Sequence, residues 1–256
     1  MNQPRPYVLA ETNWKHVKDE RYDVALLPWG ATEAHNYHLP YATDNLQAEF
    51  VAVSSAERAW NQGVKSIVLP CVPFGVNTGQ KEIKLCLNMM PSTQLSLLND
   101  IAAVLGNAGI NKLVIVNGHG GNHFKQMIRE LSCMHPALFT CSIDWYKAIN
   151  AYQFFEEPGD HAGELETSCL LHISPDLVLP LAQAGDGDAR SFKIEGLRKG
   201  WVTAQRQWDQ VSADTGVGNP QHASASKGES FLNASCEQIA SFLVDLAGAD
   251  IDAMYE

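Results

Sequence analysis

The chain has 256 residues, of which 45% are hydrophobic and 18% charged, with 29 Asp and Glu against 18 Lys and Arg. This length and composition exclude a disordered chain and predict a single soluble domain spanning residues 1–256, with a substantial core. The net charge of −11 argues against nucleic-acid and anionic-membrane partners, because such partners require a broad basic face.

No apolar stretch reaches the ~20 residues of a transmembrane helix. Residues 1–11, which include Pro4 and Pro6, lack the apolar core of a signal peptide. The six cysteines are scattered and form no CxxC pair, which argues against a disulfide framework and a thiolate zinc site. We therefore expect a cytoplasmic protein with reduced thiols.

Four short apolar runs predict buried parallel strands, because each is rich in branched side chains and bounded by Gly, Pro or Asn. These runs span residues 24–27, 66–69, 113–116 and 138–143. Apolar side chains at helical spacing predict helices over residues 45–60, 94–107, 123–134 and 233–246. The alternation predicts an α/β domain with a mostly parallel sheet, and the glycine-rich stretch 183–219 predicts long loops.

Polar residues gather in three segments that follow predicted strands, where ligands bind in parallel sheets. Glu33, His35 and Asp44 follow the first strand, His119 follows the third, and residues 160–168 come after the fourth. Imidazole and carboxylate groups without thiolates suit zinc, manganese or iron(II) in a hydrolytic site. The first three residues could hold one ion. His119 and a carboxylate from the last segment would bring the ligands to five, enough for two metals if one carboxylate bridges.

Each of these residues also has a simpler interpretation. Asp44 could cap a helix, His119 could belong to a phosphate-binding glycine turn, and His38 could brace its loop. A nucleophilic serine is poorly supported because the chain contains no GxSxG elbow. Cys169, near His161 in sequence, is the candidate for a cysteine nucleophile. The coincidence of three polar segments after strands favours a metal centre.

The three segments also carry separated sequence motifs. They read Gly30-x-x-Glu33-x-His35-x-x-His38-Leu39-Pro40-x-x-Thr43-Asp44, Asn117-Gly118-His119-Gly120-Gly121-Asn122 and His161-Ala162-Gly163-Glu164-x-Glu166-Thr167-Ser168. In this order they resemble the creatininase (creatinine amidohydrolase) family. The resemblance implies a three-layer α/β/α sandwich, two divalent metal ions, and hydrolysis of a non-peptide C–N bond, often in a cyclic amide. It also implies a homo-oligomer, commonly a hexamer.

Residue by residue, the resemblance implies a set of metal ligands. They are Glu33 and His119 for one ion, His35 and Glu166 for the other, and Asp44 as the bridge between them. Creatininase itself takes a Glu at the position that is Gly121 here, and members with the present motif use the equivalent of Glu166 instead. His161 matches the family's proton-transfer histidine, for which Asp160 or Glu164 is a candidate orienting group.

The substrate side departs from the family pattern Gly-x-Ser-x-x-His, since Asn77 replaces the Ser and Gln80 replaces the His. We expect Gln80, Gly120 and Trp145 to line the substrate site, with Trp201 or Trp208 as further candidates to wall a flat substrate.

The resulting hypothesis is an amidohydrolase in which a hydroxide shared by two metals attacks the carbonyl of a small-molecule amide, which we expect to be cyclic. His161 then moves a proton to the leaving nitrogen. Two alternatives stay open at this point. The same centre could cleave a formamide or peptide bond, or the chain could be a non-catalytic family member that serves as an assembly partner.

Overall fold

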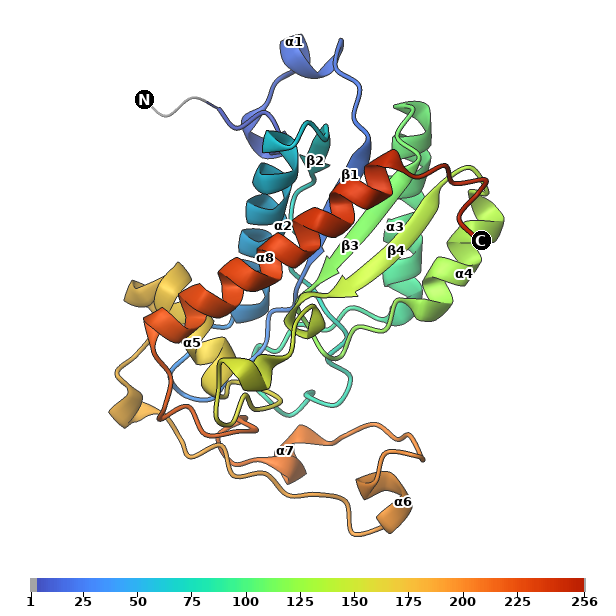
Figure 1. Ribbon diagram of the computed structural model, residues 1–256. Coiled ribbons are helices and arrows are strands. Elements are labelled where there is room, and N and C mark those ends of the chain that lie inside the picture. The colour runs from blue at the N-terminus through green and yellow to red at the C-terminus, as the bar shows by residue number, and fades with distance from the viewer. Residues whose placement is uncertain (1–3, 256) are drawn as a thin grey trace.

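A four-stranded parallel sheet lies at the centre of the structure, a computed structural model that describes residues 4–255 (Figure 1). Residues 1–3 and 256 of the predicted domain lie outside the described residues. The strand order is β2-β1-β3-β4. The bounds are β1 (Val24–Trp29), β2 (Ser66–Val68), β3 (Lys112–Asn117) and β4 (Phe139–Asp144). All four predicted strands are therefore confirmed, with ends shifted by one or two residues.

Four long helices correspond to the predicted ones, and shorter helices add to them. The α-helices are α1 (Trp14–Val17), α2 (Thr43–Asn61), α3 (Pro91–Asn107), α4 (Lys125–Met134), α5 (Glu164–Ile173), α6 (Glu195–Arg198), α7 (Trp208–Val211) and α8 (Ala225–Gly248). Helix α8 begins earlier than predicted because Ser224 caps it by accepting the Lys227 N–H. Its first turns carry small polar residues, so the apolar spacing begins later. The stretch 183–219 is mostly loop, as predicted, interrupted by α6 and α7.

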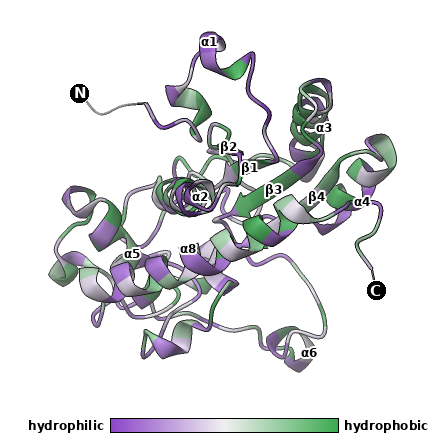
Figure 2. Ribbon diagram, turned by 45° about the horizontal axis from the view of Figure 1, so that its top comes forward, coloured by the Kyte–Doolittle hydropathy of each residue, from purple (hydrophilic) through white to green (hydrophobic). Residues whose placement is uncertain are grey.

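Alternating side chains of the strands face two separate cores, one on each side of the sheet. Val24 and Leu26 of β1 belong to the core that contains residues of α2 and α8, whereas Ala25 and Leu27 belong to the core of α3 and α4. Figure 2 shows hydrophobic colour along β3 and a mixture of hydrophilic and hydrophobic colour along α8. The layers α2/α8, sheet and α3/α4 confirm the three-layer sandwich.

An aromatic cluster anchors α8 to the segment that follows β4. Phe231 is fully buried, and its ring centroid lies 5.9 Å from Trp145, 5.5 Å from Phe154 and 5.2 Å from Phe155. We expect Phe231→Ala to lower the free energy of unfolding by about 3–5 kcal/mol, because it removes this contact area and leaves a cavity. Urea denaturation measures the change. The exposed Tyr152 offers the control: Tyr152→Ala should change stability by no more than about 0.5 kcal/mol. Equal losses in the two variants would contradict the assigned role of Phe231.

Two further expectations concern the chain as a whole. Within residues 4–255, no helix is both long and apolar enough to cross a membrane. The six cysteines, all within the described residues, are unpaired thiols. Cys169 is fully buried in the core between α5 and α8, and burial raises the pKa of its thiol well above the usual value. This placement is unsuited to a nucleophile.

Candidate metal centre

The candidate site lies at the carboxyl edge of the sheet, where loops after β1 and β3 meet the start of α5. Six predicted residues converge there: Glu33 and His35 after β1, Asp44 in the first turn of α2, His119 after β3, and His161 and Glu166 at the start of α5. The first five are buried and Glu166 is partly buried. The structure thus brings the three predicted segments together, although they are far apart in the sequence.

One cluster joins Glu33, Asp44 and His119. The Nδ1 atom of His119 lies 2.9 Å from Glu33 Oε1 and 3.1 Å from Asp44 Oδ2. Ligand atoms about 2.0–2.2 Å from a zinc ion are about 3.0–3.4 Å apart at angles of 90–110°, so these three atoms can face one ion. His119 Nε2 lies 3.1 Å from the carbonyl of Val76. A carbonyl only accepts, so Nε2 donates there and Nδ1 is directed at the cluster.

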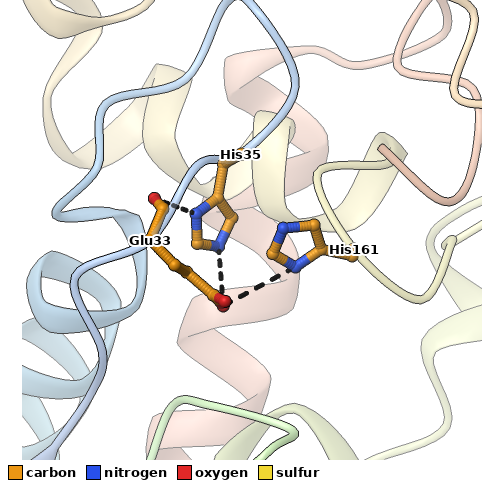
Figure 3. A group of neighbouring side chains, drawn as sticks. All are labelled: Glu33, His35 and His161. Carbon is orange, nitrogen blue, oxygen red and sulfur yellow. Dashed lines mark hydrogen bonds and ion pairs between the residues drawn. The ribbon is translucent and has the colours of Figure 1, made fainter. Parts of the chain in front are cut away.

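A second cluster joins His35, Asp44 and Glu166. The Nε2 atom of His35 lies 3.0 Å from Asp44 Oδ1 and 3.9 Å from Glu166 Oε1. His35 Nδ1 lies 3.1 Å from the backbone carbonyl of Glu33, which orients the ring (Figure 3). The other carboxylate oxygen of Glu166 accepts the N–H of Ala162, whose φ of 51° is in the left-handed region. Asp44 therefore offers one oxygen to each cluster, which is the geometry of a bridging ligand.

The burial of the carboxylates in the two clusters also suits divalent cations. Asp44 Oδ2 is buried and faces His119 Nδ1 at 3.1 Å, so a positive charge is needed between them, either a cation or a proton on His119. Glu33, Asp44 and Glu166 bring three carboxylates into one buried volume with imidazole nitrogens as the neutral donors. This set of oxygen and nitrogen ligands suits zinc, manganese or iron(II).

The pKa shifts of the cluster residues also indicate that the site favours positive charge. Burial alone would lower the pKa of His35, but Asp44, Glu166 and Glu33 outweigh it and raise the pKa to about 10. Burial likewise opposes the charge on His119, yet Glu33 and Asp44 raise its pKa well above the usual value. Burial and the neighbouring Asp44 carboxylate raise the pKa of Glu166 to about 7, although His35 opposes the shift. Without metal, protons on the two histidines balance the carboxylates.

His161 stands beside both clusters, between two aromatic rings. Its ring centroid lies 4.1 Å from that of His35 and 4.8 Å from that of Trp208. Its Nε2 atom lies 2.9 Å from the carbonyl of Ala34 and donates to it. Its Nδ1 atom is therefore the unprotonated nitrogen of the neutral ring, and it faces Glu33 Oε1 at 3.8 Å (Figure 3).

Neither acidic neighbour orients His161, so that expectation is wrong. Asp160 pairs with Arg206, and their atoms lie 2.6 Å apart, whereas Glu164 pairs with Lys227. The carbonyl of Ala34 takes the orienting role instead. A backbone carbonyl carries no signal in the identity of a residue, which is why sequence reasoning missed it.

The simpler interpretations of two residues are also resolved. Asp44 is not the cap of α2, since the N-cap position is Ala42 and no side chain caps the helix. His38 does brace its loop, because its Nε2 atom contacts Thr167 Oγ1 at 2.8 Å.

Gly121 cannot be replaced easily, because a Cβ there would collide with His119 Nε2. This collision explains why a Glu at that position is incompatible with the present loop.

A cavity of about 960 Å³ opens onto the centre. Gln80, Gly120 and Trp208 border it, as do side chains from the first turns of α3 and α4. Trp145 also borders it but is fully buried against Phe231, so it supports the wall from behind. Trp201 is 75% exposed and does not belong to the cavity wall. Substrate contact by Gln80, Gly120 and Trp145 stays a prediction.

Comparison with known proteins identifies the family of the chain. A sequence model described as "Creatininase: Creatinine amidohydrolase" matches residues 10–243. The chain is 30% identical over 208 residues to a mycofactocin precursor peptide peptidase of Mycolicibacterium smegmatis, covering 80% of this chain and 78% of that protein. It is 25% identical over 177 residues to the creatinine amidohydrolase of Pseudomonas putida, covering 60% of this chain and 66% of that protein.

Solved structures give the same result. A Bacteroides fragilis crystal structure, provisionally named as a creatinine amidohydrolase, superposes with a TM-score of 0.92 at 42% identity over the full length of both chains. A creatininase variant of the Zn-Zn type superposes with a TM-score of 0.79 at 23% identity, covering 96% of this chain and 100% of the other, which shows the shared fold. By its sequence and its fold, the chain belongs to the creatininase family.

Proposed function

We propose that this creatininase-family hydrolase cleaves an amide-type C–N bond with two divalent ions held by the five predicted ligands. The observation that carries the proposal is the arrangement of Asp44, whose Oδ1 faces His35 and whose Oδ2 faces His119. A carboxylate that offers one oxygen to each of two ligand groups would help to hold two divalent ions, the arrangement on which two-metal hydrolysis depends. Zinc, manganese and iron(II) are the candidate ions, and zinc and manganese are named in structures of relatives with this fold.

The residues of the chain divide the catalytic work between them. Divalent ions in such a centre supply a water nucleophile at neutral pH and polarise the substrate carbonyl. Glu33, His35 and Asp44 hold their positions because the loop after β1 and the start of α2 are buried. The Nδ1 atom of His161 faces the centre and is unprotonated in the neutral ring, so it can accept the proton that the attacking water gives up and pass it to the leaving nitrogen, which is otherwise a poor leaving group. Trp208 packs on His161 and excludes water from its outer side.

The favoured substrate is a small molecule with a non-peptide C–N bond in a cyclic amide, as in the Pseudomonas putida relative named creatinine amidohydrolase. One observation supports a second candidate, a peptide bond. The cavity of about 960 Å³ is at the upper end of the roughly 300–1,000 Å³ range of small-molecule pockets, and it has room for several residues of an extended peptide. The mycobacterial relatives named as precursor peptide peptidases agree with this second candidate.

A hydrolysis screen separates these candidates. The protein is stripped of metal and assayed with cyclic ureides, lactams, formamides and short peptides, each with zinc, manganese or iron(II) added. We expect hydrolysis of a cyclic amide that depends on added metal. Activity on linear peptides alone would replace the cyclic-amide proposal by the second candidate. A protein that binds no ion, or hydrolyses none of the four classes, would favour the non-catalytic alternative.

A further inference from the structure

The carboxylate of Glu33 is held from behind by a side chain outside the ligand set. Glu33 directs Oε1 toward His119 at 2.9 Å, and its other oxygen, Oε2, accepts a hydrogen bond from Gln80 Nε2. Gln80 lies in the loop between β2 and α3 and is only 3% exposed. The two oxygens of Glu33 thus have separate partners, one toward the candidate centre and one toward Gln80.

A second contact fixes which end of the Gln80 amide faces Glu33. The thiol of Cys86 donates to Gln80 Oε1 at 3.1 Å, and the backbone N–H of Ala34 donates to Cys86 Sγ at 3.3 Å. An ionised carboxylate only accepts hydrogen bonds, so the NH₂ end of Gln80 must face Glu33. Burial raises the pKa of the Cys86 thiol, so the thiol keeps the hydrogen that it donates at neutral pH.

These contacts close into a ring. It runs from Glu33 to Gln80, from Gln80 to Cys86, and from Cys86 to the backbone N–H of Ala34, the residue that follows Glu33 in the chain. The side chain of Glu33 is therefore tied to its own backbone through two other side chains. Such a closed arrangement removes rotamers in which both carboxylate oxygens, or neither, would face the centre.

We propose that Gln80 is a positioning residue that holds Glu33 as a one-oxygen metal ligand, and that the Cys86 thiol orients Gln80 for this role. The inference rests on the proposed function, because it assigns Glu33 to a metal ion. It also differs from the expected role of Gln80 as a substrate contact, since both polar ends of its amide are engaged by the protein. Partners of this kind, behind a metal ligand, typically contribute a factor of about 10–100 to metal affinity.

The test measures metal affinity rather than turnover. Metal-free parent, Gln80→Leu and Gln80→His are titrated with zinc in competition with a chromophoric chelator, and cobalt(II) absorption spectra report the ligand geometry. We expect Gln80→Leu to bind the ion at Glu33 and His119 about 10–100-fold more weakly with an altered cobalt spectrum. Gln80→His, which retains an N–H donor for Glu33, should recover most of the affinity.

A second pair of variants keeps the test decisive if Gln80→Leu fails to fold. Cys86→Ser retains a donor to Gln80 Oε1, whereas Cys86→Ala lacks one, so the alanine variant should bind metal more weakly than the serine variant. Cys71→Ala is the matched control, because Cys71 is another partly buried thiol and contacts neither Gln80 nor Glu33. Its affinity should equal that of the parent.

The outcomes distinguish a failure of the inference about Gln80 from a failure of the proposed function. A parent that binds zinc together with a folded Gln80→Leu that binds it equally well would overturn the inference alone. The same holds if Cys86→Ala and Cys86→Ser bind zinc with the same affinity as the parent. A parent that binds no divalent ion would overturn the proposed function, and the inference would fall with it.

Discussion

Asp44→Ala should remove both metal ions from the protein, because Asp44 directs one carboxylate oxygen at each of the two clusters. His35 lies 3.0 Å from one of its oxygens and His119 lies 3.1 Å from the other. We expect metal content after dialysis to fall from about two ions per chain to near zero. Activity should fall by well over the roughly 100-fold that changes behind a ligand produce. Elemental analysis of the dialysed protein measures the first change and steady-state kinetics the second.

A matched control lies on the same helix. Glu49 is an exposed carboxylate of α2, so Glu49→Ala removes one negative charge from that helix without touching either cluster. Its metal content should equal that of the parent. His119→Ala extends the test, since it should weaken the cluster with Glu33 and leave His35 and Glu166 in place. If Asp44→Ala and His119→Ala retain the parent's metal content, the two-metal proposal is wrong.

His161→Gln should separate catalysis from metal binding. The variant loses the ring nitrogen that faces the centre, so kcat should fall by about 10²–10⁴-fold, the usual contribution of a positioned acid or base. Metal content should stay at the parental value, because His161 is proposed to transfer a proton rather than to bind an ion. The loss should be smaller for an anilide whose leaving nitrogen bears electron-withdrawing groups, since such a nitrogen departs with less help from a proton.

Two outcomes would change the role of His161. It lies close enough to Glu33 and His35 to complete a third potential ligand group, so loss of an ion along with activity would make it a ligand. Equal losses for good and poor leaving groups would contradict proton delivery. His172→Gln provides the control, because His172 lies at the end of α5 and packs its ring against Phe50, 5.9 Å away.

The layered fold could be predicted because its signal is local. The strand Val24–Trp29 is buried along its whole length, so it appears in the sequence as a continuous apolar run. Helix α5 has no comparable signal, since its first turn is polar where Glu164 and Glu166 serve an ion pair and the candidate centre. The five proposed ligands could be predicted from the sequence, because the side chain at each of those motif positions is itself an imidazole or a carboxylate that can bind a metal ion.

The rest of the site depends on atoms that residue identity does not report. The carbonyl of Ala34 orients His161, and any residue at position 34 would offer the same carbonyl. Trp208 reaches His161 from the glycine-rich stretch, and Cζ of Arg206 lies 4.8 Å from the centroid of the Trp208 ring. Only the folded chain shows that Cys86 and Gln80 meet behind Glu33. Such long-range contacts have no spacing rule that a sequence pattern could reveal.

The backbone pairing of His161 also bears on when the centre can form. His161 and Val217 form an antiparallel bridge, with the Val217 N–H donating to the His161 carbonyl at 2.8 Å. A ribosome that adds about 5–20 residues per second needs several seconds to extend the chain from the first of these residues to the second. A nascent chain that stops before residue 217 therefore lacks the backbone pairing that holds His161, the proposed proton-transfer residue, although all five proposed metal ligands precede that point.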